Sequence, residues 1–192
     1  MSAPPTFPEY LSTLFALWNT KRGMRVMPSR RDFATVELLP WLSELHLVAV
    51  RPDGLHFIVF ATGPATRYGA EMTGRTVAEL EPDTMAREVE RAYLAAVETR
   101  APMFGTQSTQ GFGGRRHSWS RLILPLSEDG LAVDRLFVAV WEEGIGFGIR
   151  SRAAQALLTS KWILAETFES ELPQPVPSST GAAEMALAAA AE

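Results

Sequence analysis

Tight-turn signals between strand-like runs constrain the fold of this chain more than any other feature. Pro52-Asp53-Gly54 separates Leu45 to Arg51 from Leu55 to Thr62, two runs rich in strand-forming residues, and this pattern indicates a hairpin. Ser127-Glu128-Asp129-Gly130 separates a further pair of such runs. Because hairpin connections make neighbouring strands antiparallel, the sequence predicts an antiparallel sheet.

The segment between these hairpins changes to a helical period. Short helical pieces are expected around Tyr68 and at Thr76 to Leu80, and a longer helix from about Asp83. Three strands follow, at residues 103–110, 117–126 and 133–141. Two strands, a helical excursion and three strands predict an α+β fold with a five-stranded antiparallel sheet, helices on one face, and flanking N- and C-terminal helices.

The flanking helices complete the domain organisation. The first is capped by Thr6, and the second begins at Ser151 with an apolar stripe. This stripe consists of Ala154, Leu157, Leu158, Trp162, Ala165 and Phe168. We therefore expect an N-terminal tail at 1–8, the domain with its N-terminal helix at 9–143, a C-terminal helix at 144–172 and a disordered tail at 173–192.

Both faces of the predicted sheet need a cover. The last two strands carry large apolar residues at odd and even positions, which alternate between opposite faces. The N-terminal helix offers four apolar side chains for this purpose: Leu11, Leu14, Phe15 and Trp18. These side chains cover the sheet of their own chain or share its surface across a symmetric homodimer. The sequence favours the dimer, with Phe15 and Trp18 near its centre.

Composition limits the partners and the compartment. Hydrophobic residues make up 46% of the chain and charged residues 21%, which is typical of a globular domain. The net charge of -4 opposes binding to nucleic acid or to anionic membranes. We expect no secretory signal and no membrane span, and hence a cytoplasmic protein.

The residue inventory also limits the cofactors. The absence of cysteine excludes disulfides, thiolate catalysis, Cys-ligated zinc, flavin photochemistry through a thiol, and thioester-linked chromophores. We do not expect haem, because His46, His56 and His117 fall in predicted strands, where histidine is usually half-exposed. No metal site is expected either, and the sequence leaves the identity of a cofactor open.

Three stretches carry a resemblance to a known family. They are Arg22-Gly23 with Met27 to Asp32, Ala61 to Gly69 leading into Met72 to Arg75, and Arg121 to Gly130 with the next strand. Across roughly residues 9 to 142 the chain resembles the PAS superfamily, in particular compact stand-alone bacterial PAS domains with an N-terminal cap helix. The resemblance implies a sensory module that binds a small molecule or a partner protein.

Candidate ligand-binding residues follow from the predicted elements. Arg67 and Tyr68 could present a guanidinium and a phenol at a pocket mouth, and Tyr93, Trp119 and Trp141 could line an apolar cavity. No acid and base with matching spacing predict catalysis, so we expect no enzyme. Two alternatives stay open: a small α+β enzyme with a cone-shaped pocket, and a ligand-free interaction scaffold.

Overall fold

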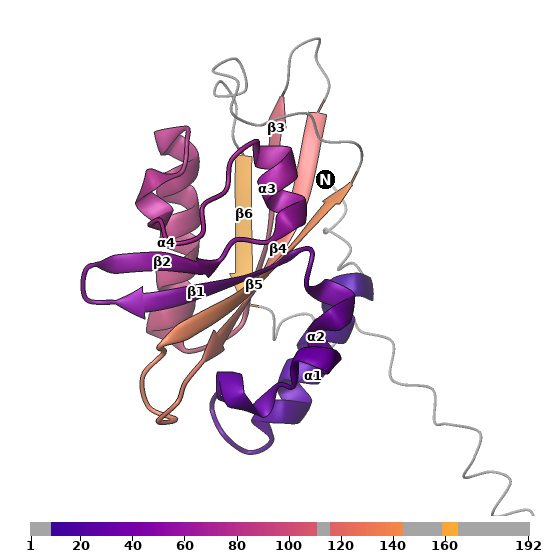
Figure 1. The fold of residues 1–192 in the computed structure, drawn as a ribbon, viewed down its shortest axis with the longest axis vertical. Helices are drawn as coiled ribbons and strands as arrows, with labels where there is room; N and C mark the ends of the chain where they lie inside the picture. Colours follow the sequence, from indigo (N-terminus) through magenta and orange to yellow (C-terminus); the bar gives the residue numbers. More distant parts are fainter. Residues whose placement is uncertain (1–8, 111–115, 144–158, 165–192) are drawn as a thin grey trace, which may run out of the picture.

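A computed structural model describes residues 9–110, 116–143 and 159–164 of the chain. The helical elements are α1 (Glu9–Arg22), η1 (Arg30–Asp32), α2 (Thr35–Leu38), η2 (Leu39–Trp41), α3 (Thr62–Tyr68), η3 (Val77–Glu79) and α4 (Asp83–Thr99). The strands are β1 (Leu45–Arg51), β2 (Gly54–Val59), β3 (Met103–Gln110), β4 (Arg116–Leu126), β5 (Arg135–Glu143) and β6 (Thr159–Leu164). Figure 1 shows α1 and α4 far apart, at different sides of the sheet.

The sheet runs in the order β2-β1-β5-β4-β3-β6, and every pair in it is antiparallel. The predicted α+β class and the five-stranded antiparallel sheet are confirmed in β1 to β5. The expected turn at Pro52 to Gly54 joins β1 to β2. Gly54 has a φ of 129°, a backbone conformation that residues other than glycine rarely adopt. β4 and β5 lie in the interior of the sheet, and helices contact them, α4 at β4 and α1 at both strands; this cover explains their apolar residues at odd and even positions.

The sixth strand lies where the sequence predicted a C-terminal helix. A helix was expected at residues 144–172, but within this range the described residues Thr159–Leu164 form β6, which pairs with β3 from Met103↔Leu164 to Ser108↔Thr159. Without this partner, the outer edge of β3 would leave its backbone N–H and C=O groups unpaired. The expected caps Thr6 and Ser151, and the tails at 1–8 and 173–192, lie outside the described residues.

α1 covers the sheet of its own chain. Its apolar side chains Leu11, Leu14, Phe15 and Trp18 are only 0–1% exposed in the single chain. The indole Nε1 of Trp18 also donates a hydrogen bond of 2.9 Å to the carbonyl oxygen of Pro125 in β4. These side chains therefore form a cap on their own sheet, and the favoured dimer with Phe15 and Trp18 at its centre does not fit their burial.

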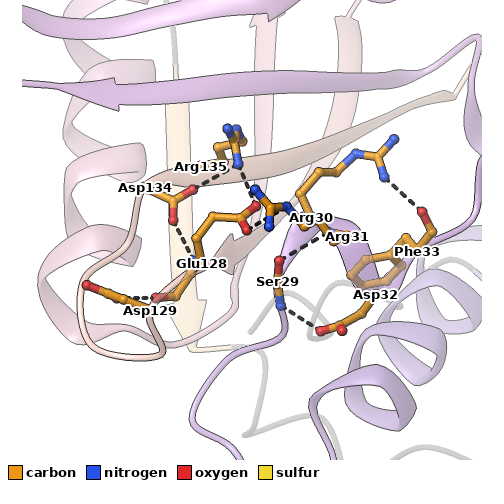
Figure 2. Close-up of polar contacts among 10 residues, drawn as sticks. Ser29, Arg30, Arg31, Asp32, Phe33, Glu128, Asp129, Asp134 and Arg135 are labelled. Atoms are coloured by element: carbon orange, nitrogen blue, oxygen red, sulfur yellow. Dashed lines mark hydrogen bonds and ion pairs between the residues drawn. The ribbon is translucent and has the colours of Figure 1, made fainter.

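A polar network fastens the segment after α1 to the turn between β4 and β5 (Figure 2). Ser29 and Asp32 form a capping box around η1, and Arg31 reaches Glu128 at 3.2 Å. Arg135 approaches the same carboxylate at 2.8 Å. The backbone N–H of Ser127 donates to the carbonyl of Pro28 at 3.0 Å. This network holds α1 in place over β4 and β5, and its charges balance one another.

Candidate ligand cavity

A cavity of about 50 Å³ lies between the inner face of the sheet and the helices α3 and α4. Its lining comes from most of the elements of the domain. The residues are His46, Phe57, Phe60, Pro64, Arg67, Tyr68, Leu80, Met85, Val89, Tyr93, Trp119, Arg121, Val140 and Glu142. The cross-strand pairs Trp119↔Glu142 and Arg121↔Val140 show that a single face of β4 and β5 supplies the floor.

Four of the five candidate ligand-binding residues line this cavity: Arg67, Tyr68, Tyr93 and Trp119. Trp141 does not, because its neighbours Val140 and Glu142 point into the cavity and alternation sends Trp141 to the other face. There it is 36% exposed, and its ring centroid lies 5.0 Å from that of Tyr10. The expectation for Trp141 as a cavity residue is therefore wrong.

Arg67 is held between two carboxylates. Its Nη1 donates to Oε1 of Glu44 at 3.0 Å, its Nη2 pairs with Oε2 of the same group, and its Nε pairs with Glu142 at 2.7 Å. The side chain of Glu142 is only 6% exposed. These contacts hold the pKa of Arg67 above its ordinary value, the hydrogen bond to Glu44 being the main cause. Arg67 is therefore committed to ion pairs and is less suited to receive an anionic ligand than the sequence indicated.

Arg121 is a cavity residue that sequence reasoning missed. Its Nη1 donates to Oε1 of Gln107, an oxygen that also accepts the indole N–H of Trp119 at 2.8 Å. The Nε of Arg121 is buried and has no hydrogen-bond partner among the described residues. Burial lowers the pKa of Arg121, and the nearby Tyr93 partly offsets this effect. A signal was present in the sequence, because Arg121 shares the parity of the apolar residues Trp119 and Ile123 in the same strand.

His46 was expected to be half-exposed, yet it is 3% exposed and lines the cavity. Its ring stacks on Phe60 with the centroids 4.4 Å apart. Its Nδ1 accepts a hydrogen bond of 3.0 Å from the backbone N–H of Ala61, which places the proton of the neutral ring on Nε2. Burial, together with the guanidinium groups of Arg121 and Arg67, lowers the pKa of His46 to about 3. His46 is therefore neutral at physiological pH.

The two cavity tyrosines have different surroundings. The hydroxyl of Tyr68 accepts a hydrogen bond of 2.6 Å from the backbone N–H of Glu81, which ties α3 to the start of α4. Burial raises the pKa of Tyr93 to about 12, so its phenol keeps its proton. Tyr93 is thus a neutral hydroxyl in the cavity wall, close to Arg121.

Residues 63–142, from within α3 to within β5, match the family model of the PAS fold. This part of the chain has the PAS fold. The hairpin of β1 and β2 precedes this match and belongs to the same sheet. The cavity described above lies between this sheet and the helices α3 and α4, both of which fall largely within the matched residues. No relative of the chain was found among the curated proteins.

Solved structures similar to this fold include PAS domains and sensor proteins of bacteria. VqmA of Vibrio cholerae bound to DPO is 13% identical with a TM-score of 0.44, over 58% of this chain and 57% of that one. The PAS domain of BvgS from Bordetella pertussis is 12% identical with a TM-score of 0.42, over 70% and 88%. A sensory box sensor histidine kinase of Vibrio cholerae is 22% identical with a TM-score of 0.40, over 58% and 90%. The chain spans about half the length of VqmA.

The cavity of this PAS domain also limits what it can hold. About 50 Å³ does not accommodate a haem macrocycle, although His46 lies in the wall. Within the described ranges, no group of three or more His, Asp or Glu side chains is arranged to hold a metal ion. None of the helices in these ranges has the length and apolar character needed to cross a bilayer.

Proposed function

We propose that this PAS domain is a sensory module that binds a small molecule in the cavity between α4 and the sheet. The observation that carries the proposal is a partly enclosed, aromatic cavity in which polar groups from four elements meet. These groups are His46 of β1, Arg67 of α3, Tyr93 of α4 and Arg121 of β4. Ligand sites in proteins typically combine an apolar wall with a few convergent polar groups.

The alternatives have less support. An interaction scaffold without a ligand predicts a filled core, whereas this core contains a cavity. A free carboxylate in the pocket would favour the enzyme, whereas Glu142, which lines the cavity, is paired with Arg67 at 2.7 Å. PAS domains are generally sensory rather than catalytic.

Arg67 provides a route from the cavity to the outside of the domain. It lines the cavity and pairs with Glu44, just before β1, and with Glu142, in β5. Glu44 and Arg67 both act electrostatically on the phenol of Tyr10 in α1, whose pKa burial raises to about 12. A ligand that shifts Arg67 would change these contacts and loosen or tighten the α1 cap. A homodimer or a partner protein would then receive the signal.

Native mass spectrometry of freshly purified protein tests this proposal, because it reports bound small molecules and subunit count together. Val89 of α4 faces the cavity, so Val89→Phe should fill it. Leu94→Phe is the matched control, since Leu94 lies on the exposed side of the same helix. We expect an adduct in the wild type and in Leu94→Phe, and none in Val89→Phe. An adduct that survives in Val89→Phe, or a bare wild-type mass with no thermal shift across a metabolite library, would contradict the proposal.

A further inference from the structure

Two guanidinium groups line the cavity, and the protein balances their charges differently. Arg67 has two carboxylate partners, Glu44 and Glu142. Arg121 has the neutral oxygen of Gln107, and no ion pair joins it to a carboxylate of the described residues. Arg121 is half-buried, and a cation partly withdrawn from water without a counter-charge is unfavourable, so the site around Arg121 lacks a negative charge.

The polar groups around Arg121 are hydrogen-bond donors that lack matching acceptors in the cavity wall. The neutral ring of His46 keeps its proton on Nε2, and the phenol of Tyr93 keeps its own. The acceptor Gln107 Oε1 already takes hydrogen bonds from both Trp119 and Arg121. The cavity carboxylate, that of Glu142, is engaged by Arg67. A ligand must therefore supply the acceptor atoms that the wall does not offer.

The geometry of Arg121 favours a carboxylate. Its Nη1 is used by Gln107, while its Nε is without a partner among the described residues. Nε and Nη2 together form the side edge with which a guanidinium grips both oxygens of a carboxylate. The rest of the lining is largely aromatic, with Phe57, Phe60, Tyr68 and Trp119, and suits a flat, unsaturated body.

From these observations we infer that the ligand of this cavity is a small aromatic or unsaturated monocarboxylate whose carboxylate pairs with Arg121. The inference rests on the proposed function, because it names the chemistry of the ligand that the cavity would sense. The ligand-free cavity of about 50 Å³ is smaller than the roughly 150 Å³ cavity that holds a benzene ring, so its walls must move outward to admit a ligand, and the body of that ligand is restricted to a single ring or a short chain.

Benzoate and benzamide form a probe pair that separates charge from shape. We expect benzoate to raise the unfolding temperature of the wild type by several degrees and benzamide to leave it unchanged. In Arg121→Met the benzoate response should vanish, with affinity at least about tenfold lower by calorimetry, as expected for loss of a charge-assisted pair. Arg91→Met is the matched control, because Arg91 is exposed on α4 and pairs with Glu88 at 2.7 Å. It should respond like the wild type.

A measurement without ligand tests the same inference. Because Arg121→Met removes a half-buried cation that lacks a counter-charge and whose Nε is buried without a partner among the described residues, this variant should unfold at a higher temperature than the ligand-free wild type. Arg121→Lys keeps the charge but loses the planar edge, so it should fold without this gain and respond weakly to benzoate. A lower unfolding temperature for Arg121→Met would show that Arg121 is stabilised within the protein and would overturn the inference.

The outcomes also separate this inference from the proposed function. Benzamide binding as tightly as benzoate, with both lost in Val89→Phe, would leave the sensory cavity standing and overturn the carboxylate assignment. No benzoate response in the wild type, combined with an adduct of uncharged chemistry in the native mass spectrum, would do the same. The absence of any adduct and of any response to either probe would overturn both.

Discussion

The burial of His46 has a consequence for stability against pH. In an unfolded chain imidazole titrates near pH 6.5, whereas in the fold the pKa of His46 is lowered to about 3. Below pH 6.5 the unfolded state binds a proton that the folded state does not. The contribution of His46 is therefore fully present above pH 6.5, and it falls by about 1.4 kcal/mol per pH unit on acidification towards pH 3.

His46→Asn should flatten this dependence. The Oδ1 of asparagine can replace Nδ1 as the acceptor for the N–H of Ala61, but the side chain does not titrate. Urea unfolding between pH 7.5 and 4.5 should show a shallower loss of stability in the variant than in the wild type, even if the variant is less stable throughout. NMR provides the direct check, and an imidazole of His46 that titrates near pH 6 would contradict the prediction.

Replacing Arg67 should show how strongly the stability of the fold depends on the ion pairs of this residue. Arg67→Met would remove the guanidinium that pairs with Glu44 and with Glu142, whose side chain is 6% exposed. We expect a loss of roughly 3 kcal/mol in the free energy of unfolding, measured by denaturant titration at pH 7.

A surface arginine provides the control for Arg67. Arg75 is well exposed and lies 3.9 Å from Glu79, so Arg75→Met should cost less than about 1 kcal/mol. Similar losses for the two arginine variants would show that the contacts of Arg67 contribute no more than those of an ordinary surface pair.

Sequence periodicity identified the cavity residues that lie on regular elements. Tyr93 and Trp119 were found because helical spacing and strand alternation each assign a side chain to a face. Arg121 and His46 were missed, since a polar residue in a predicted strand is usually exposed and its burial depends on partners far away in the chain. The pairing of Arg67 with Glu44 and Glu142 is likewise a contact between distant segments, which no local pattern records.

Among the helices, α1 offers the sharpest test of the packing. Leu14 is 0% exposed in the single chain, so Leu14→Ala should lower the free energy of unfolding by about 2–5 kcal/mol. Leu17→Ala on the same helix is the control, because Leu17 is only partly buried and should cost less. Chemical denaturation followed by tryptophan fluorescence measures both. Equal, small losses would show that α1 is not packed on the sheet.

A double substitution distinguishes the cap from a dimer interface. If Leu14 and Trp18 lay in a dimer interface, Leu14→Glu with Trp18→Glu would yield a folded monomer. Because both side chains are buried against the chain's own sheet, we expect this double variant to unfold or to aggregate. Circular dichroism and light scattering together decide between the two outcomes.

The C-terminal region shows where element prediction from periodicity fails. The apolar residues from Ala154 to Phe168 have helical spacing, yet Thr159–Leu164 is a strand. A short apolar run does not distinguish a helix from a strand by itself. The deciding interaction is the pairing of β6 with the edge of β3, some 50 residues earlier in the chain, as in Gly105↔Trp162. In contrast, β1 to β5 and α4 were predicted well because tight turns and clear periods mark them locally.

For the molecule as a whole, the absence of a thiol and the small cavity predict a colourless protein. No cysteine is present to form a covalent adduct with a chromophore, and about 50 Å³ excludes haem. Protein purified from cells supplied with haem and flavin precursors should therefore show no Soret band and no flavin bands in the blue. Either absorption would require the cavity to expand well beyond its present walls.

Homodimerisation remains part of the proposed function, but the burial of the α1 cap moves any interface elsewhere. The connection between α1 and β1 carries several large apolar side chains that are exposed: Met24, Val26, Val36, Leu39 and Leu42. Because exposed apolar clusters often mark interaction sites, we expect a second copy of the chain to bind there.

Light scattering at micromolar concentration tests this interface. The wild type should be a dimer and Leu39→Glu a folded monomer, since a charge placed among apolar side chains opposes their burial. Leu131→Glu is the control, because Leu131 is also exposed but lies in the turn between β4 and β5, and this variant should stay dimeric. If the wild type is monomeric, homodimerisation fails, and a signal from the cavity must then reach a different protein through Arg67 and the α1 cap.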